Sequence, residues 1–478
     1  MAYRADDVVG AIGEIGRWQV RLILLLSLVG IECGWQVLLI NFQAPPADHW
    51  CASPTAHGNQ SQWRHLDPAD QRTGVEREPS QCSSYIPDAG GATGATTRNN
   101  STTPCNAWNY DTSEYSNTII MEWDLVCERK WLQMLTQATY MIGIMFGVMF
   151  WGIAADRYGR RPTLFACIVL TSFLANLIAA AGSVEQFLVL RFLTAFCGIG
   201  AYTSSFVMSM ELVGDRWRVL LGIAFFLPMS FSFIALSGIA YFIRDWRMLQ
   251  LAVSLPSVLY VVYFLGGEAG AGRRAEACLD LITNGRMLAV TGCLFFGWFV
   301  NSLVFYGILL NTGDFGEDIY LNACLGGVVE IPAYALCTYA TYRLGRRRPI
   351  SCTMVGAGLA CLLTLACEKG AYQYDWPIVS LAMISRFCIT ASFGSIYIYS
   401  AELFPTAVRN TGLASCSFAA RFGGILAPLL LLLRDEVHPA FPVVVFGLAA
   451  MVAGLTILLL PETADRPLPE CIADVEGK

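Results

Sequence analysis

The sequence contains little charge and little histidine. Charged residues make up 14% of the 478 residues, against roughly 25% in soluble domains. The net charge is −6, so the chain lacks the basic footprint of a nucleic-acid-binding protein. Its 4 histidines form no HExxH motif, and no G-x-x-x-x-G-K-[ST] phosphate loop occurs. These absences argue against a soluble domain, a zinc hydrolase and an ATP-driven pump, and we predict no enzyme activity, no cofactor, no metal site and no nucleic-acid partner.

Long hydrophobic runs are abundant instead. Hydrophobic residues make up 55% of the chain, and a bilayer core about 30 Å thick needs about 20 apolar residues per helix. The leader before the first run contains Asp6, Asp7 and Glu14, which favours an uncleaved first helix over a signal peptide. We predict an all-α polytopic membrane protein with twelve spans, near 22–42, 132–153, 163–182, 186–208, 219–242, 246–265, 288–310, 320–341, 350–367, 377–400, 411–433 and 441–461.

Arginines are concentrated in alternate short loops. They cluster at 157–161, 216–218 and 343–348, whereas the opposite short loops carry only Arg244, Arg247, Lys369 and Arg434. Positive charge in short loops marks the cytoplasmic side of a membrane protein. We therefore predict a multi-pass protein in which the arginine-rich side and both termini are cytoplasmic. Residues of about 43–130 then form one large extracellular loop.

This loop has the composition of an extracellular segment. Its sequons, which begin at Asn59, Asn99 and Asn100, are the only ones in the chain, and we predict that they are glycosylated. Four cysteines in an oxidising compartment suggest two disulfides. Three connectivities are possible, and we favour Cys51–Cys105 with Cys82–Cys127. The other thirteen cysteines are expected to be small hydrophobic residues in the membrane helices.

Three short motifs occur twice, in the same order and 186 to 195 residues apart. They are RYGRRP (157–162) and RLGRRRP (343–349), Arg-Phe at 191–192 and 386–387, and Glu-Leu followed by Arg in MELVGDRWR (210–218) and AELFPTAVR (401–409). Secondary transporters are often built from such repeats, with the substrate site between them. We predict two six-helix halves, 1–265 and 287–478, joined by a short cytoplasmic linker, 266–286.

The repeated charges lie at the cytoplasmic ends of predicted helices. We interpret them as a gate whose ion pairs form between the halves in one conformation and separate in the other. Ordinary positive-inside topology with charged helix ends is the alternative interpretation. For Arg191 and Arg386, inside the spans, we favour a structural role. The predicted gating residues are Asp156, Arg157, Arg160, Glu211, Arg218, Glu402 and Arg409.

Several motifs resemble those of a known family. GIAADRYGRRP (152–162) is similar to the loop between helices two and three of the major facilitator superfamily. Together with the cysteine-bearing first loop, EWDLVCERKWL (122–132), IRDWRMLQL (243–251), VVEIPAY (328–334) and SAELFPTAVRNTGLA (400–414) resemble the organic cation, organic anion and carnitine transporters. The resemblance covers nearly the whole chain and is closest to the carnitine branch over 317–435. It implies alternating-access transport of small organic ions, by a monomer in the plasma membrane.

The chain departs from the family pattern in two places. The PESPRW motif and the helical segment expected after the sixth span are replaced by GGEAGAGRRAEACLDLITNGRM (266–287). In the first span, Glu32-Cys33 replaces the Pro-Asn pair that the carnitine transporters use for sodium coupling. Sodium and proton both remain open as coupling ions, and Glu32 is a candidate for ion coupling or for a structural hydrogen bond.

Ionisable residues inside a span are candidates for the substrate site. Arg421, in FAARFGGILAP, suits a carboxylate because a guanidinium can bind it through two hydrogen bonds. Glu330 could face a cationic head group or pair with another residue. Aromatic faces attract quaternary ammonium, and the resemblance places Tyr202, Trp298, Phe305 and Tyr397 at the cavity, although helix packing would equally explain each of them. The set suits a zwitterion.

Two other functions are compatible with the same motifs. A sugar porter would share the superfamily loops, but it lacks the first-loop cysteines and usually offers amides and hydroxyls to its substrate. A transporter-like endocytic receptor would instead capture a ligand with its glycosylated loop. Uptake of a labelled organic ion separates these alternatives.

The loop assignment predicts a mass shift. PNGase treatment of the protein from animal cells should lower its apparent mass on an immunoblot, because the sequons at Asn59, Asn99 and Asn100 would face the lumen of the secretory pathway during synthesis. The variant with all three asparagines changed to Gln should migrate at the treated position. An untreated wild-type band at that same position would contradict the extracellular placement.

Overall fold

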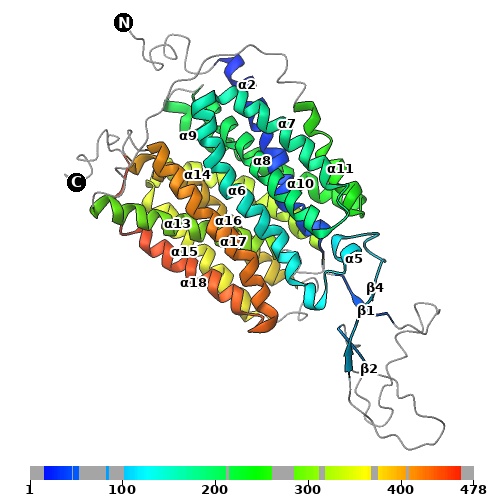
Figure 1. Ribbon diagram of the computed structural model, residues 1–478. Coiled ribbons are helices and arrows are strands. Elements are labelled where there is room, and N and C mark those ends of the chain that lie inside the picture. The colour runs from blue at the N-terminus through cyan, green and yellow to red at the C-terminus, as the bar shows by residue number, and fades with distance from the viewer. Residues whose placement is uncertain are drawn as a thin grey trace, which may run out of the picture.

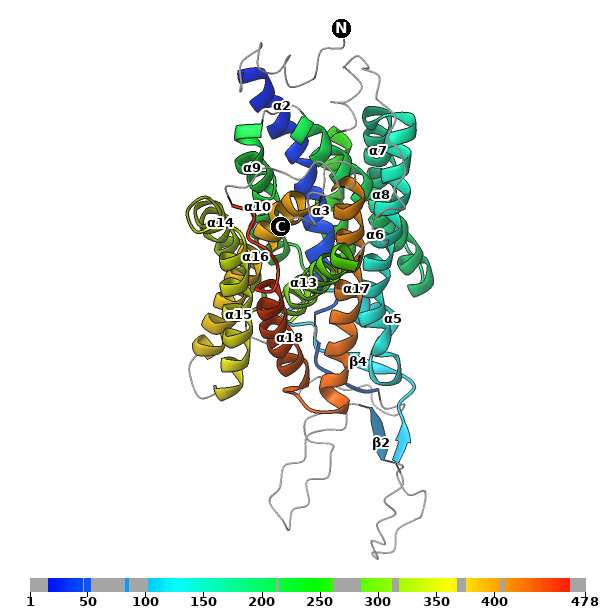
Figure 2. The same ribbon diagram turned by 90° about the vertical axis from the view of Figure 1, so that its left-hand side faces the viewer.

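The computed structural model describes residues 16–45, 47–52, 82–85, 102–211, 215–260, 285–311, 318–367, 375–404 and 409–464. Long helices run roughly parallel between the end of the molecule where the first helix begins and the end that carries short β-strands (Figures 1 and 2). The predicted linker 266–286 lies outside the described residues except for its last two positions, and the three sequon asparagines lie outside them as well.

The helices follow the predicted spans closely. The first half contains α2 (Arg17–Ser27), α3 (Val29–Leu38), α4 (Ile40–Gln43), α6 (Trp131–Tyr158), α7 (Arg160–Ile178), α8 (Val184–Glu211), α9 (Asp215–Ala224), α10 (Leu227–Phe242) and α11 (Trp246–Ser254). The second half contains α13 (Gly285–Leu310), α14 (Ile319–Leu344), α15 (Arg347–Leu363) with the 3-10 turn η4 (Thr364–Ala366), α16 (Trp376–Leu403), α17 (Arg409–Glu436) and α18 (Phe441–Ile457).

Ten of the predicted spans coincide with helices that are long and apolar enough to cross a membrane. The sixth span is described only as far as residue 260 and contains the 9-residue helix α11. The twelfth is the 17-residue apolar helix α18. The prediction of an all-helical membrane fold is therefore confirmed, and two of its twelve spans are shorter in the described chain than the sequence suggested.

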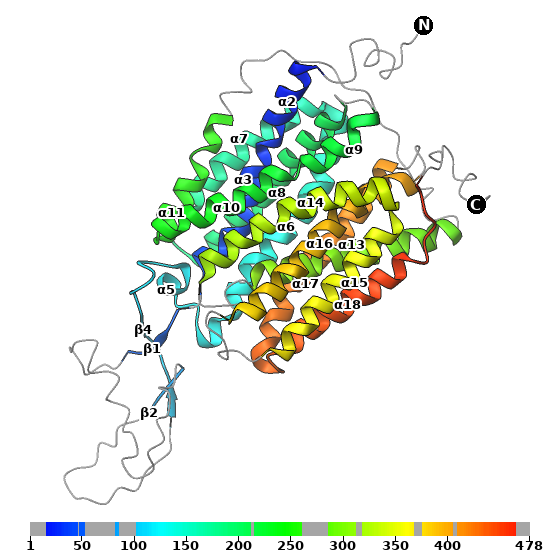
Figure 3. The ribbon, with the colours of Figure 1, turned by 180° about the vertical axis from the view of Figure 1, so that it is seen from behind.

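The segment between the first two spans forms a small lobe, which we call the loop lobe (described residues 47–52, 82–85 and 102–130). Its elements are strands β1 (His49–Cys51), β2 (Ser83–Tyr85), β3 (Thr102–Pro104) and β4 (Trp108–Tyr110), helix α5 (Ile119–Trp123) and the 3-10 turn η2 (Cys127–Arg129). β1 pairs with β4 and β2 with β3, both antiparallel. The strands lie at the end of the molecule away from the start of α2 (Figure 3).

Two disulfides cross-link the loop lobe. They link Cys51 to Cys105 and Cys82 to Cys127, the pairing favoured from the sequence. His49 lies near Cys82 and Cys127. Because both sulfur atoms are consumed by the disulfide, they cannot serve as thiolate ligands, and this group does not form a metal site.

Glu122 anchors the loop lobe to the first half. Its carboxylate forms an ion pair with Arg247 and accepts hydrogen bonds from the Trp246 indole (2.8 Å) and the Asn117 amide (3.1 Å). Arg247 also donates to the backbone oxygens of Ala179 and Ala181, just after α7. The motifs EWDLVCERKWL and IRDWRMLQL therefore meet in space, which explains why both are needed in one chain.

The two halves pack closely along two helix pairs. Gly327 of α14 has no room for a side chain, since a Cβ atom there would lie 2.9 Å from the Ser230 backbone oxygen of α10. On the opposite side α6 contacts α17, and Figures 1 and 3 show these pairs side by side. Two glycines with positive φ, Gly159 (98°) and Gly345 (86°), end α6 and α14 at the same place in the two repeated motifs.

The Glu122 anchor predicts a pH-dependent contribution to stability. Partial burial alone would raise the pKa of Glu122, but hydrogen bonds from Arg247, Trp246 and Asn117 outweigh it and hold the pKa below its ordinary value. A carboxylate with a lowered pKa stabilises the fold above its unfolded pKa, and this stabilisation is lost as pH falls through the folded pKa. Glu122→Gln should cost about 1 kcal/mol at pH 7, because the pair is partly exposed.

The measurement is thermal unfolding of the purified protein in detergent, between pH 7 and pH 3. The difference between wild type and Glu122→Gln should be largest at pH 7 and disappear at the acid end. Glu128→Gln, which changes an exposed acid of the same lobe, is the matched control and should unfold with the wild type throughout. A constant difference at every pH would show that the carboxylate charge is not what stabilises the lobe.

Candidate substrate site

Arg421 lies in the middle of α17, at the contact between the two halves. The two glycines that follow it allow this approach: a Cβ atom at Gly423 would lie 2.2 Å from the Phe299 backbone oxygen on α13. At Gly424 it would lie 3.1 Å from the Met141 sulfur on α6 of the first half. The two glycines therefore let α17 approach α13 and α6 closely, and the half-buried Arg421 lies where these three helices meet.

The guanidinium of Arg421 interacts electrostatically with side chains from both halves. They are Cys33 of α3, Tyr202 of α8, Tyr306 of α13 and Tyr397 of α16. Among the described residues no carboxylate lies within ion-pair distance of Arg421, and its Nε atom is buried without a hydrogen-bond partner. A cation in this position has hydrogen-bonding capacity left for an anionic group of a ligand.

Tyrosines surround this cation. Tyr202 and Tyr397 were selected from the sequence, and the buried Tyr202 hydroxyl has no hydrogen-bond partner. Tyr306 was not selected, although its neighbour Phe305 was. One residue turns the helix by about 100°, so Phe305 instead faces Arg386, whose guanidinium lies 5.3 Å from the ring centre. Knowledge of which face of α13 meets α17 was needed to choose between them.

Trp298 lies behind this group of tyrosines. Its side chain is fully buried, and its indole N–H donates to the Ser400 hydroxyl at 2.9 Å. The ring centre lies 4.2 Å from that of Tyr397. Trp298 thus packs against Tyr397 and fixes its position, which corresponds to the packing alternative considered for each aromatic residue.

Glu330 is engaged in a buried ion pair. Arg386 donates to it at 2.6 Å, and both side chains are only 2% exposed. The other carboxylate oxygen accepts a 2.7 Å hydrogen bond from Ser230 of α10, which belongs to the first half. In this arrangement the Glu330 charge is neutralised by Arg386, and its second oxygen links the two halves.

Arg191 has no such partner, although it occupies the corresponding motif of the first half. It is fully buried and donates to the Gln36 backbone oxygen (3.2 Å) and the Gln137 side-chain oxygen (3.4 Å). Its guanidinium lies 4.7 Å from the ring centre of Tyr140. Within the described chain, Arg386 is thus neutralised by an acid, whereas Arg191 contacts neutral groups.

The charged residues at the end of α16 form a network within the second half. Glu402 accepts hydrogen bonds from Arg346 (2.9 Å) and from the Thr463 hydroxyl (2.6 Å). Glu462 accepts from the backbone N–H of Arg346 at 2.8 Å. Arg346, Glu462 and Thr463 were not on the predicted list, although the RLGRRRP repeat pointed to the first of them.

The remaining predicted gating residues are only partly described. Asp156 interacts electrostatically with Arg160, and the Arg157 guanidinium lies 5.6 Å from the ring centre of Tyr158. The side chains of Glu211, Arg218 and Arg409 lie outside the described part of the chain. Each ion pair between described side chains joins residues of one half, so pairing between halves stays a prediction.

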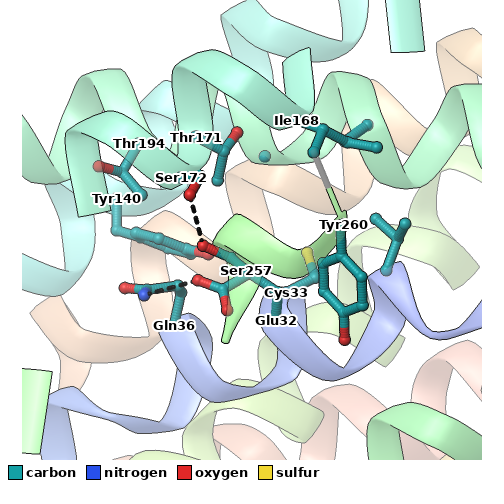
Figure 4. A pocket seen from close by; sticks show the side chains of 13 residues that line it. Glu32, Cys33, Gln36, Tyr140, Ile168, Thr171, Ser172, Thr194, Ser257 and Tyr260 are labelled. Carbon is teal, nitrogen blue, oxygen red and sulfur yellow. Dashed lines mark hydrogen bonds between the residues drawn. The ribbon is translucent and has the colours of Figure 1, made fainter. Parts of the chain in front are cut away.

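Glu32 lies on α3, in a small cavity inside the first half (Figure 4). Its side chain is 6% exposed and accepts a 3.0 Å hydrogen bond from Gln36 one turn later. Cys33, the next residue, interacts electrostatically with both Glu32 and Arg421. Cys33 is therefore a neighbour of both Glu32, the candidate for ion coupling, and Arg421, the candidate for substrate binding.

Comparison with known proteins agrees with this architecture. A family model described as Major Facilitator Superfamily matches residues 131–340, and one described as Sugar (and other) transporter matches residues 278–474. The fold is similar to the inward-open xylose transporter XylE of E. coli, with a TM-score of 0.63 and 15% identity over 96% of this chain and 99% of that chain. At this identity the likeness shows the fold alone.

Sequence relatives match over almost the whole chain. The organic cation transporter protein of Drosophila melanogaster is 34% identical over 99% of this chain and 94% of its own length. Solute carrier family 22 member 3 of Mus musculus is 30% identical over 98% and 95%, and member 6 of Danio rerio is 31% identical over 99% and 94%. The chain is therefore a multi-pass membrane transporter, not an enzyme, and it belongs to the solute carrier family 22 of organic ion transporters within the major facilitator superfamily.

Proposed function

We propose that this protein transports carboxylate-bearing organic ions, in particular zwitterions such as carnitine, across the plasma membrane as a monomer. The observation that carries the proposal is Arg421, a half-buried guanidinium among tyrosines of both halves that no described carboxylate neutralises. A substrate carboxylate would satisfy its buried Nε donor. The cationic part of a zwitterion would lie against the faces of Tyr202 and Tyr397.

A purely cationic substrate is the second candidate, because one of the relatives is named an organic cation transporter. It would depend on the tyrosine faces alone at this site, since Glu330 is already paired with Arg386. Repulsion by Arg421 would oppose it. We therefore rank carboxylate-bearing substrates first. In an uptake test, transport of a sugar, or ligand capture without transport, would contradict both organic-ion candidates.

For the transport cycle we propose rocking of the halves 1–265 and 287–478 about the Arg421 site, with the loop lobe outside the cell and both termini inside. Near the loop lobe the halves are in contact: the Asn41 amide donates to the Leu309 backbone oxygen at 2.7 Å, and the Phe42 ring stacks on Tyr320. The Ser230–Glu330 hydrogen bond lies deeper in the same interface. Opening toward the loop lobe requires these contacts to separate.

The role of Arg421 is tested by removing its charge. Arg421→Ala should lower uptake of radiolabelled carnitine at least about tenfold, because a lost charge-assisted pair in a water-poor site is worth upwards of about 1.4 kcal/mol. Uptake of tetraethylammonium, which has no carboxylate, should not fall. Arg17→Ala, at an exposed position, is the control. Surface biotinylation must show equal expression, and unchanged carnitine kinetics would remove Arg421 from the site.

The role of the cytoplasmic network is tested at Glu402. Glu402→Gln weakens the ion pair with Arg346. We expect this pair to affect the rate of the conformational change between the halves and not the affinity for substrate. The maximal rate should fall several-fold with KM nearly unchanged, measured as concentration-dependent uptake. Exchanging the two charges, with Arg346→Glu and Glu402→Arg together, should recover part of the rate. A change confined to KM would contradict a role in the conformational step.

A further inference from the structure

The loop lobe contains a histidine beside one of its two disulfides. A ring nitrogen of His49 and the sulfur atoms of Cys82 and Cys127 all lie within 4.8 Å of one another. Within the described chain, the disulfide between Cys51 and Cys105 belongs to no such group. An imidazole next to a disulfide can exchange protons with a thiol that approaches it, so the two disulfides of the lobe differ in their chemical surroundings.

The pairing of β1 with β4 positions the His49 ring. His49 lies opposite Tyr110 in this pair, and the two ring centres are 6.1 Å apart. Nδ1 of His49 lies 3.1 Å from the backbone oxygen of Ala47. Because this oxygen can only accept a hydrogen bond, Nδ1 carries the hydrogen. Nε2 is buried and has no hydrogen-bond partner among the described residues, so it holds a lone pair that can accept a proton.

The two sulfur atoms of this disulfide differ in access. Cys82, immediately before β2, is exposed, whereas Cys127 is only partly exposed. Figure 1 shows β2 farther from the membrane helices than β1. Both cysteines of the other disulfide, Cys51 and Cys105, are also only partly exposed. Access decides which sulfur atom an incoming thiolate attacks, so we expect the attack to occur at Cys82.

Cys127 is placed to be the leaving group of such an attack. It is the first residue of the 32-residue helical span Cys127–Tyr158, and the N–H groups and dipole at a helix N-terminus stabilise a thiolate. A more stable thiolate leaves faster in thiol–disulfide exchange. Cys127 also has a φ of 52°, in the left-handed region that side-chain-bearing residues rarely adopt. Release from the disulfide would allow this backbone to relax.

We propose that the disulfide between Cys82 and Cys127 is a thiol-exchange site, opened by low-molecular-weight thiols such as glutathione. His49 takes the proton of the thiol, and the resulting thiolate attacks the sulfur atom of Cys82. A new sulfur–sulfur bond forms there while the bond to Cys127 breaks, and the electron pair leaves with Cys127 as a thiolate. The His49 imidazolium then returns its proton to this thiolate. The sulfur of the incoming thiol is oxidised and that of Cys127 is reduced, so no other reagent is needed.

Opening this bond removes one attachment of the loop lobe and leaves two others. The strand pair of β2 and β3 loses its covalent link to the start of the second span. It remains joined to β1 through the disulfide between Cys51 and Cys105. The ion pair between Glu122 and Arg247 involves neither disulfide. The exchange therefore acts on the attachment of the outer strands to α6, and it does not depend on which substrate the protein transports.

The experiment uses the purified full-length protein in detergent, with its free thiols first blocked by N-ethylmaleimide. Reduced glutathione is then added at neutral pH, and samples are quenched over time with an isotope-labelled maleimide. Peptide mass spectrometry follows each cysteine of the lobe. The disulfide between Cys82 and Cys127 should open at least about tenfold faster than that between Cys51 and Cys105, because access and leaving group both favour it. The first product should carry glutathione on Cys82 and the maleimide label on Cys127.

The role of the imidazole is tested with His49→Gln, whose amide can still donate to Ala47 but cannot take a proton. This variant should open the disulfide between Cys82 and Cys127 at least about tenfold more slowly than wild type, since a general base is lost. The other disulfide should be unaffected, and His438→Gln, at an exposed position of the second half, is the matched control.

Thermal unfolding of the unreduced variant should match that of wild type, which shows that the lobe is intact. Wild-type protein alone also tests the proposal, should the variant not fold. Equal opening rates for the two disulfides of wild type, or glutathione found on Cys127 instead of Cys82, would overturn the exchange site. Opening of folded His49→Gln at the wild-type rate would overturn the part assigned to the imidazole.

Discussion

A charged side chain inside the bilayer must be neutralised by a partner or used by a ligand, and this constraint organises the interior of the molecule. The pair formed by Glu330 and Arg386 satisfies it within the protein, at 2.6 Å and with almost no exposure. Arg421 does not meet a described carboxylate, and neither does Arg191. The free energy of leaving such a group unpaired is several kcal/mol, so the unpaired guanidinium of Arg421 at the contact of the two halves supports our proposal that a substrate carboxylate binds it.

The two halves share sequence motifs and helix ends, but they neutralise their buried arginines differently. Both contain the glycine with positive φ at the end of a helix, Gly159 and Gly345, and both contain an Arg-Phe pair whose arginine is buried. The second half supplies an acid to its arginine. The first half supplies the Gln137 amide instead and carries its acid, Glu32, in a cavity one step away. The repeated fold thus has a similar backbone in both halves but different charges: the second half holds a buried ion pair, and the first half holds a buried glutamate and a buried arginine that do not pair with each other.

The features that could be predicted from the sequence are those that depend on a short stretch of residues. The spans followed from apolar length, and the four disulfide cysteines followed from their place in one polar loop, although three pairings were open. Arg421 was selected because charge is rare in a span, and its role in substrate binding stays a prediction. What could not be predicted depends on which helices face each other. Phe305 and Tyr306 are neighbours in sequence, and only the contact of α13 with α17 decides which of them meets Arg421. The repeated charges were expected to pair between the halves, whereas the described partner of Glu402 is Arg346, 56 residues away in the same half.

In the described chain, the loop lobe is held to the first half by an ion pair and contacts the second half only through neutral groups. Its ionic attachment lies on the first half, where Glu122 binds Arg247 at the start of α11. Toward the second half the contacts converge on Tyr320, which meets the hydroxyl of Tyr115 in the lobe and the rings of Phe42 and Tyr241 in the first half. Stacked rings and one neutral hydrogen bond separate at a cost of about 1 kcal/mol each, far less than a charge left unpaired. If the halves rock as we propose, the lobe would move with the first half and would separate from the second at Tyr320, where each contact is weak.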